Sequence, residues 1–414
     1  MRIIVIGAGI IGMTSAYALA REGHAVTVVD GAASAGMATS RANGAQLSYS
    51  FVAPLADASV LPKLPLWLTQ RDAPLYFRLR ADPAQWRWAL RFLLACRAGV
   101  AQRSTAELLQ LGAYSRELTH EMAERALLQF DFSSRGKLLV YQDTKAYESA
   151  IALMQFQADL GTEQHALTTS ECLRQEPALG GIAERIVGGI FTPTEDAGDC
   201  FALCQEMTRH LEIEHDVKFL FDTRVQRLQT RAGRVVALQT QHGALDADAY
   251  VIANGVGAQD LCRPLGFDPL IYPLKGYSLT YELTPGSSAP HTSLSDVHNK
   301  VVYARLGNRL RVAGMVDVGT ESDARSPQRF ATLKAQVQDY LPHLNAAAAP
   351  EEWSGLRPAR PDSKPLIGAT PYGNLWLNVG HGALGFTLAA GSAGLLADRI
   401  ARRPSRIDPT LFQL

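Results

Sequence analysis

The sequence predicts an α/β fold, α+β in its overall composition, that contains a nucleotide-binding sheet. Three observations predict it. Residues 3–30 read as a strand, a glycine turn, a helix and a second strand; residues 249–257 read as an apolar strand that ends in a glycine turn; and residues 374–400 read as a strand, a glycine loop and a small-residue helix. Such strand ends at three distant places indicate one sheet that is assembled from separated pieces of chain.

The first of these units carries a Gly7-x-Gly9-x-x-Gly12 motif between its strand and its helix. Gly7 permits the tight turn, Gly9 lets backbone N–H groups approach a pyrophosphate, and Gly12 lets the helix pack closely on its strand. The positive end of the helix favours two phosphates. Asp30 ends the second strand, where its carboxylate can accept hydrogen bonds from ribose hydroxyls. The unit therefore predicts a bound dinucleotide.

Composition agrees with a large enzyme of a reducing compartment. The chain has 414 residues, 47% of them hydrophobic, and its formal net charge is zero, so no global field attracts nucleic acid. Five cysteines form no disulfide-like array, and Cys200 and Cys204 lack the second Cys or His pair that a metal site needs. No apolar run can span a bilayer, and a signal-peptide interpretation fails because cleavage would remove the glycine motif. We expect a cytoplasmic protein without a metal site.

Two contrasting segments follow the first unit. Residues 31–47 are rich in Gly, Ala, Ser and Asn and predict a backbone-lined loop. Residues 58–130 predict helices, with apolar residues at helical spacing and arginines on another face: Trp86, Ala89, Leu90, Leu93 and Leu94, against Arg87 and Arg91. Residues 61–100 contain seven Lys or Arg and two Asp. Such a basic segment suits anionic lipid, but a solvated helix face is the commoner explanation and is favoured here.

The middle of the chain alternates strands and helices without βαβ order. A strand at 136–141 precedes a helix that Gly161 closes. Asp199 suits the N-cap of a helix that runs to about His210. Hairpins are predicted across residues 231–233 and 306–308, and the apolar strand from Ala249 predicts the return strand of the nucleotide-binding sheet.

The loop at 380–385 repeats the arrangement of the N-terminal motif, since glycines again lead into a helix. Close backbone approach to an electron-rich group is the expected use, and beside a flavin ring this helix end would stabilise the reduced anion. NAD-dependent dehydrogenases usually keep the nucleotide domain contiguous. A sheet collected from three distant pieces therefore favours buried FAD over NAD.

Blocks over nearly the whole chain now carry a resemblance to a known family. They are GAGIIG, SRANGAQ, EDAGDC, YPLKGYSLT, RVAGM, GLRPARPDSKPLIG and NLWLNVGHGALGFT. The chain resembles the D-amino-acid dehydrogenase small-subunit branch of the FAD-dependent amine and amino-acid oxidoreductases, relatives of glycine oxidase and D-amino-acid oxidase. The resemblance implies a discontinuous Rossmann-like FAD-binding domain (1–50, 195–267 and 351–414) and a substrate domain on a mainly antiparallel sheet (51–194 and 268–350).

The resemblance also implies which residues contact FAD. We expect them in the phosphate loop, at the ribose, in the second loop, at the adenine, in the turn after the return strand and beside the flavin ring: Gly7, Gly9, Ile10, Ile11, Gly12, Asp30, Thr39, Ser40, Asn43, Gly44, Ala45, Gln46, Val225, Asn254, Gly255, Gly380, His381, Gly382, Ala383, Leu384, Gly385 and Thr387. No cysteine follows Cys262, which disfavours a C-terminal cysteinyl link, so we expect non-covalent FAD.

For the substrate, the resemblance implies that Arg357 clamps the α-carboxylate, because a planar guanidinium grips both oxygens and fixes the direction of the Cα–H bond. Tyr303 matches a tyrosine that holds the same carboxylate in glycine oxidase, although not every relative has one there. His381 is expected to be structural rather than a general base. Whether Lys275, Tyr277 or Tyr49 faces the substrate is left open.

The expected reaction is oxidation of a D-amino acid by hydride transfer from Cα to FAD, followed by hydrolysis of the imino product to a 2-oxo acid and ammonia. A quinone or another respiratory acceptor would take the electrons, which permits contact with the inner face of the plasma membrane. An oxidase, or an enzyme for D-proline, D-hydroxyproline or glycine-type secondary amines, is the close alternative. A flavin-binding subunit or redox module of a complex is the alternative of another class. The sequence does not determine side-chain preference or oligomeric state.

Overall fold

The computed structural model describes residues 1–70, 73–320 and 326–414, and its first sheet confirms the expected assembly from distant pieces. Six strands lie in the order β19-β20-β13-β1-β2-β9. All neighbours are parallel except the edge pair β19 and β20. The strands are β1 (Arg2–Ile6), β2 (Ala25–Val29), β9 (Lys218–Leu220), β13 (Ala249–Ile252), β19 (Leu366–Ala369) and β20 (Leu375–Val379).

Both faces of this sheet are covered, which explains why its strands read as continuous apolar runs. In β1, Ile3 and Val5 face a helical layer, whereas Ile4 and Ile6 face a small three-stranded sheet. The helical layer consists of α1 (Ile10–Arg21), α4 (Ala98–Arg125), α7 (Cys200–His215) and α10 (Gly385–Ile400). The small sheet consists of β10 (Val225–Arg231), β11 (Arg234–Thr240) and β12 (Gly243–Leu245), and α8 (Ala258–Cys262) joins its side of the core.

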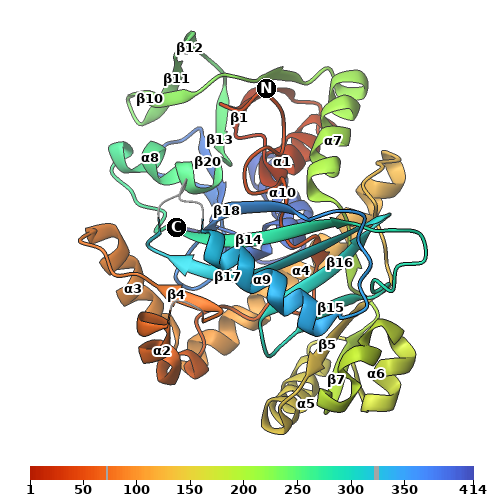
Figure 1. Ribbon diagram of the computed structural model, residues 1–414. Coiled ribbons are helices and arrows are strands. Elements are labelled where there is room, and N and C mark those ends of the chain that lie inside the picture. Colours follow the sequence, from red (N-terminus) through yellow and green to blue (C-terminus); the bar gives the residue numbers. More distant parts are fainter. Residues whose placement is uncertain (71–72, 321–325) are drawn as a thin grey trace.

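A second sheet of nine strands crosses the middle of the molecule (Figure 1). Its order is β18-β14-β17-β16-β15-β5-β7-β6, with β4 beside β17, and it is mainly antiparallel, as expected. Its strands are β4 (Leu75–Phe77), β5 (Lys137–Tyr141), β6 (His165–Leu167), β7 (Gly188–Thr192), β14 (Tyr272–Glu282), β15 (Ser293–Asp296), β16 (Val301–Leu306), β17 (Arg309–Val318) and β18 (Glu351–Ala359). Two short strands, β3 (Gln46–Leu47) and β8 (Asp196–Ala197), pair separately.

Helices cover the second sheet unevenly (Figure 1). Helix α9 (Pro327–Tyr340) lies across one face and shares an apolar cluster with it. Helices α5 (Thr144–Ala158) and α6 (Thr169–Gln175) cover the end that β5, β6 and β7 form. Helices α2 (Leu64–Thr69) and α3 (Pro83–Ala95) form a corner beside β4. No helix of the described residues is both long and apolar enough to cross a membrane.

Several expectations about single elements are confirmed and others need correction. The two hairpins, the strand at 137–141 and the Asp199 N-cap are present, and the Asp199 side chain accepts hydrogen bonds from two helix N–H groups. Helix α7 is longer than expected, since it continues to His215 and stops where Asp216 adopts φ of 51°. The segment 58–130 is not continuously helical, because β4 interrupts it; its Arg71 and Asp72 lie outside the described residues.

The domain boundaries remain a prediction, but two segments lie differently from what they imply. Strand β18 belongs to the nine-stranded sheet, whereas residues 351–359 were expected on the cofactor side. Helix α4 packs against α10 in the core of the first sheet, whereas it was expected in the substrate domain. Sequence order alone does not show these placements, because each segment docks on a partner more than 70 residues away.

Candidate cofactor and substrate site

The glycine motif forms a turn that only glycine can occupy. Gly7 has φ of +107°, and a Cβ there would lie 2.7 Å from the Asn254 Cα. A Cβ on Gly12 would lie 1.7 Å from the Gly7 carbonyl oxygen. The motif therefore lies directly against the turn after β13, which brings Asn254 and Gly255 to the phosphate loop. The side-chain Oδ1 of Asn254 is buried without a hydrogen-bond partner among the described residues.

Asp30 connects the glycine motif with the segment before β10. One carboxylate oxygen accepts from the Ala8 N–H at 2.6 Å, and the other accepts from the Ala32 N–H at 2.8 Å. The Asp30 carbonyl oxygen accepts from the Thr223 N–H at 2.8 Å, two residues before Val225. Asp30 and Val225 thus lie at one end of the predicted cofactor path, and each carboxylate oxygen keeps a further lone pair for a ribose hydroxyl.

The second loop, residues 39–46, joins the two sheets. Ser40 Oγ accepts from the Ile10 N–H at 3.0 Å, at the first turn of α1, and Thr39 Oγ1 donates to the Leu356 carbonyl oxygen at 2.6 Å on β18. Gln46 Nε2 donates to the carbonyl oxygens of Leu294 and Tyr303. The loop therefore touches both the phosphate motif and the strand that carries Arg357.

Ala45 is strained within this loop. Its φ is 58°, a left-handed value that costs a residue with a Cβ free energy, and its N–H donates to Asn43 Oδ1 at 3.0 Å. A Cβ on neighbouring Gly44 would lie 3.2 Å from Val302 on the sheet. Strained backbone held closely against a sheet face is typical of a functional site.

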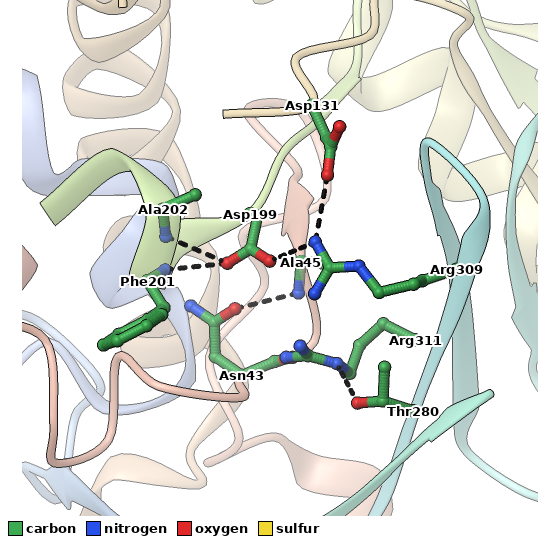
Figure 2. Close-up of polar contacts among 9 residues, drawn as sticks. All are labelled: Asn43, Ala45, Asp131, Asp199, Phe201, Ala202, Thr280, Arg309 and Arg311. Carbon is green, nitrogen blue, oxygen red and sulfur yellow. Dashed lines mark hydrogen bonds and ion pairs between the residues drawn. The ribbon is translucent and has the colours of Figure 1, made fainter. Parts of the chain in front are cut away.

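Two arginines of β17 that the sequence did not single out lie near this loop, and one of them bonds to it (Figure 2). Arg309 pairs with Asp199 at 2.9 Å and with Asp131 at 3.0 Å. Arg311, which is buried, donates to Thr280 Oγ1 and to the Asn43 carbonyl oxygen. The alternation of charged and apolar residues in β17 was the available signal, but the strand pattern does not show that Arg311 meets Asn43 or that Arg309 meets Asp199.

The third loop, residues 380–385, lies beside the end of β18 through a bridge between Ala359 and His381. Gly382 to Gly385 keep exposed surface, whereas His381 is buried, and its Nε2 lies 3.0 Å from Ser392 Oγ. Burial lowers the pKa of His381 to about 3, so the ring is neutral at physiological pH. The Thr387 hydroxyl accepts from the Ser48 N–H at 3.0 Å, which connects this loop with the end of the second one.

Arg357 is part-buried on the face of β18 that is turned to the second loop. Its guanidinium lies over Gly276, where a Cβ would approach Cζ to 2.4 Å, and Nη1 donates to the Met315 carbonyl oxygen at 3.3 Å. Burial lowers the pKa of Arg357 to about 10, and no carboxylate of the described residues pairs with it. A desolvated cation without a protein counter-ion favours an anionic ligand.

A β-bulge places the Met315 carbonyl. Gly276 pairs with Val316 and Tyr277 pairs with Gly314, so Met315 is the extra residue in β17, and its φ is 59°. Bulges often redirect groups next to active sites. No sequence pattern predicts this bulge, because Met is an unusual residue at positive φ.

The structure does not bring Tyr303 and Arg357 together, which corrects the expectation that both hold the same carboxylate. Tyr303 is fully buried in the cluster under α9, where its ring stacks on Tyr340 at 5.0 Å between centroids. Alternate residues of a strand point to opposite faces, and Tyr303 lies on the face away from Gly276 and the second loop. Tyr277 also lies on the α9 face and donates to Asp317 at 2.6 Å.

A buried polar cluster follows the second loop. Lys137 Nζ donates to Ser48 Oγ at 2.8 Å, and Glu195 Oε1 accepts from the Ser50 N–H at 2.7 Å. Burial lowers the pKa of Lys137 to about 8 and raises the pKa of the Glu195 carboxyl. Tyr49, between the two serines, is also buried, and its hydroxyl has no hydrogen-bond partner among the described residues. The sequence indicated this cluster only through a lysine at the start of an apolar strand.

These residues fit a dinucleotide and a carboxylate ligand. The backbone cradle at Gly7 and Gly12 is closed to any side chain, and the first N–H groups of α1 have no intrahelical partners. Among the described residues, Asn254 Oδ1 has no hydrogen-bond partner and Arg357 has no carboxylate partner, so both groups are available to a ligand. One site for a long cofactor and a small anion is what this arrangement supports.

Comparison with known proteins agrees with this geometry. The sequence model of the family described as FAD dependent oxidoreductase matches residues 2–399. The chain is 47% identical to "D-amino acid dehydrogenase 2" of Ralstonia nicotianae, with 100% of both chains covered, and 44% identical to the protein of that name from Pseudomonas aeruginosa, with 99% and 97% covered. In fold, it is similar to glycine oxidase from Geobacillus kaustophilus, with a TM-score of 0.78, 21% identity, and 100% and 98% covered.

Proposed function

This chain belongs to the FAD-dependent oxidoreductase family, and on that premise we propose that it catalyses the oxidative deamination of D-amino acids to 2-oxo acids and ammonia. Relatives named D-amino acid dehydrogenase that match it over its full length support the substrate class. The observation that carries the proposal is Arg357, a desolvated guanidinium with a single carbonyl partner on the face turned to the cofactor loops.

The proposed cofactor contacts follow the three loops. The glycine motif and the first turn of α1 hold the pyrophosphate, Asp30 the ribose, and the segment at Val225 the adenine. Residues 39–46 and 380–387 enclose the flavin end. Bound FAD supplies the acceptor for the hydride that leaves the substrate Cα. The five cysteines are buried and free, and His381 is occupied by Ser392, which supports non-covalent binding.

Arg357 orients the substrate in this proposal. Two charge-assisted hydrogen bonds to the α-carboxylate fix the amino acid in one direction, and the Met315 carbonyl keeps the guanidinium from turning away. No residue of the chain is required as a base, because the substrate amine needs only to be neutral when it reacts. His381, with a pKa of about 3, stays neutral and supports its loop through Ser392.

The electron acceptor is proposed to be a quinone or another respiratory carrier, reached at the cytoplasmic surface of the membrane. The test is product analysis of the FAD-loaded protein with a panel of D-amino acids, D-proline and glycine, with and without an artificial acceptor. We expect 2-oxo acid and ammonia from D-amino acids only when the acceptor is present. Rapid peroxide formation in air would show that the enzyme is an oxidase and not a dehydrogenase. Preference for D-proline or glycine would show that the proposed substrate class is wrong.

A redox module whose partner performs catalysis is the competing class of function. An uncompensated arginine beside the cofactor loops argues against it, because a module has no need to orient a carboxylate. Turnover of D-amino acids by the purified chain alone would separate the two, and failure with every amino acid would favour the module.

A further inference from the structure

Arg311 is a second buried cation that pairs with no carboxylate of the described residues (Figure 2). It is 4% exposed, on the face of β17 that the second loop covers. Nε donates to Thr280 Oγ1 at 2.8 Å, and Nη1 donates to the Asn43 carbonyl oxygen at 3.1 Å. Both acceptors are neutral oxygens, to which an uncharged amide can also donate. The positive charge of Arg311 is therefore not needed for these two hydrogen bonds.

The carboxylates in the surroundings of Arg311 have closer partners. Asp199 binds Arg309 at 2.9 Å with one oxygen, and its other oxygen caps α7 by accepting from two N–H groups. Glu351 lies 3.6 Å from Arg41. Burial lowers the pKa of Arg311, because the charged guanidinium is removed from water. A desolvated charge without a close counter-ion favours a ligand that gains negative charge.

Hydrogen bonds to the nine-stranded sheet fix two successive peptide groups of the second loop. Ser278 Oγ donates to the Ala42 carbonyl oxygen at 2.7 Å, and Arg311 donates to that of Asn43. The C=O and N–H of a trans peptide point in opposite directions, so the N–H groups of Asn43 and Gly44 point away from the sheet. Neither N–H has a hydrogen-bond partner among the described residues, and both residues keep exposed surface. Adjacent free N–H groups suit an electron-rich atom of a ligand.

The surroundings of the second loop make FAD the ligand that these N–H groups face. At one end of the loop, Ser40 bonds to the first turn of α1, and Thr39 reaches the strand of Arg357. Beyond the other end, the Ser48 N–H donates to Thr387 in the third loop. A peptide whose carbonyl oxygen accepts from a cation is polarised, so its N–H is a stronger donor.

We propose that Arg311 stabilises the reduced form of bound FAD through the peptide group between Asn43 and Gly44, and so raises the midpoint potential of the flavin. Hydride transfer breaks the Cα–H bond of the substrate and delivers two electrons and one proton to the ring, which gains one negative charge. Arg311 keeps its own proton and acts through the peptide, so it is a positioning residue. Positive charge in a site of low dielectric constant favours the reduced anion. The role in turnover rests on the proposed function, whereas the effect on the potential requires only bound FAD.

The midpoint potential of the FAD-loaded full chain, measured by chemical reduction against a reference dye, tests the proposal without substrate. Arg311→Gln can still donate to Asn43 but carries no charge. It should lower the equilibrium constant for reduction about tenfold or more, which is about 30 mV for two electrons. Arg311→Lys keeps the charge and should stay close to the unchanged chain. Arg305→Gln is the matched control, since it removes the same charge from β16, where the arginine donates to Ala289 on the α9 side of the sheet.

Substitution of Thr280 gives a second test that leaves Arg311 in place. Thr280→Asp would put a carboxylate beside Nε and neutralise the guanidinium, so the equilibrium constant for reduction should again fall. Thr280→Asn is the neutral control and should keep the potential of the unchanged chain. This pair decides the question if Arg311→Gln does not retain FAD.

Two outcomes would overturn the proposal. One is an unchanged potential in Arg311→Gln or in Thr280→Asp. The other is an equal fall in Arg311→Lys and Arg311→Gln, which would make the guanidinium only a structural group. Failure of the proposed function has a different signature, namely the expected shifts in potential in a chain whose flavin no D-amino acid reduces.

Discussion

Among single residues, Arg357 matters more to the proposed function than any other side chain. A protein rarely leaves a guanidinium desolvated beside one carbonyl, because the cost of removing it from water is then uncompensated. In the proposed function, the carboxylate of the substrate supplies the missing partner. In this interpretation the folded chain tolerates the desolvated guanidinium of Arg357 because a bound ligand neutralises its charge.

Substitution of Arg357 tests this role. Arg357→Met should lower kcat/KM for D-alanine about a hundredfold or more, since two charge-assisted hydrogen bonds are lost. Bound FAD and thermal stability should change little, because the guanidinium has one weak protein partner. Tyr303→Phe is the control, and it should keep the kcat/KM of the unchanged enzyme. Equal activity of Arg357→Met and the unchanged enzyme would remove the clamp from the account.

The lowered pKa of Lys137 predicts how the stability of the folded chain depends on pH. Its pKa is about 8 in the folded chain and near 10.5 when unfolded, so the unfolded chain binds more protons between these values. Burial of the charged lysine therefore lowers the free energy of unfolding fully below pH 8. This destabilisation is lost as the pH rises from 8 to 10.5. Urea unfolding across this range should show a rise that Lys137→Met removes and that Lys145→Met, at an exposed lysine, keeps. Identical pH profiles for the unchanged chain and Lys137→Met would contradict it.

Sequence analysis predicts the positions of residues that belong to a local motif. It does not predict which way a strand residue points, because that depends on how the strand pairs within its sheet. The spacing of Gly7, Gly12 and Asp30 fixes their positions within one local unit. Tyr303 sits in a strand where either face was possible, and only its pairing with the neighbouring strands directs it toward Tyr340. Lys137 gave little signal, because its partner Ser48 lies 89 residues away.

At the level of elements, the pairing of β14 with β18 positions the Arg357 guanidinium. The two strands pair so that Gly276 lies under the Arg357 guanidinium, and the bulge in β17 supplies the Met315 carbonyl on the same side. A glycine in a strand interior weakens the strand, which is acceptable where another group must approach the backbone closely.

Gly276→Ala tests this arrangement. The new Cβ would lie 2.4 Å from Arg357 Cζ, so the guanidinium must move. We expect KM for D-alanine to rise about tenfold or more while the spectrum of the bound flavin is unchanged, because the cofactor loops are not touched. Gly99→Ala, where no atom lies within 4 Å of the added Cβ, is the control. An unchanged KM in Gly276→Ala would show that the guanidinium position does not matter.

Elements whose ends carry their own sequence signals were predicted well. Elements that could pack on either of two neighbours were not. The N-cap Asp199 and the hairpin turns carry their own signals. Helix α3 has apolar residues on two opposite sides, so its pattern could not show that Trp88 and Phe92, rather than Trp86 and Leu90, face the core. Strand β18 follows the second sheet in sequence order and pairs with β14, which no local pattern in residues 351–359 reveals.

At the scale of the whole molecule, hydrogen bonds at the second loop hold the two sheets together. Ser278 Oγ donates to the Ala42 carbonyl oxygen at 2.7 Å, and Arg311 Nη1 donates to that of Asn43 at 3.1 Å. Thr39 reaches β18 directly. The second loop therefore also supports the nine-stranded sheet, and in the proposed function this junction sets the distance between bound flavin and Arg357.

The anaerobic absorbance spectrum of the purified chain tests the central claim, that loops from three distant pieces hold FAD beside an arginine that orients a D-amino acid. We expect a flavin spectrum that D-alanine bleaches rapidly and L-alanine does not, together with an intact spectrum and slow bleaching in Arg357→Met. A colourless protein, or equal bleaching by both enantiomers, would contradict it.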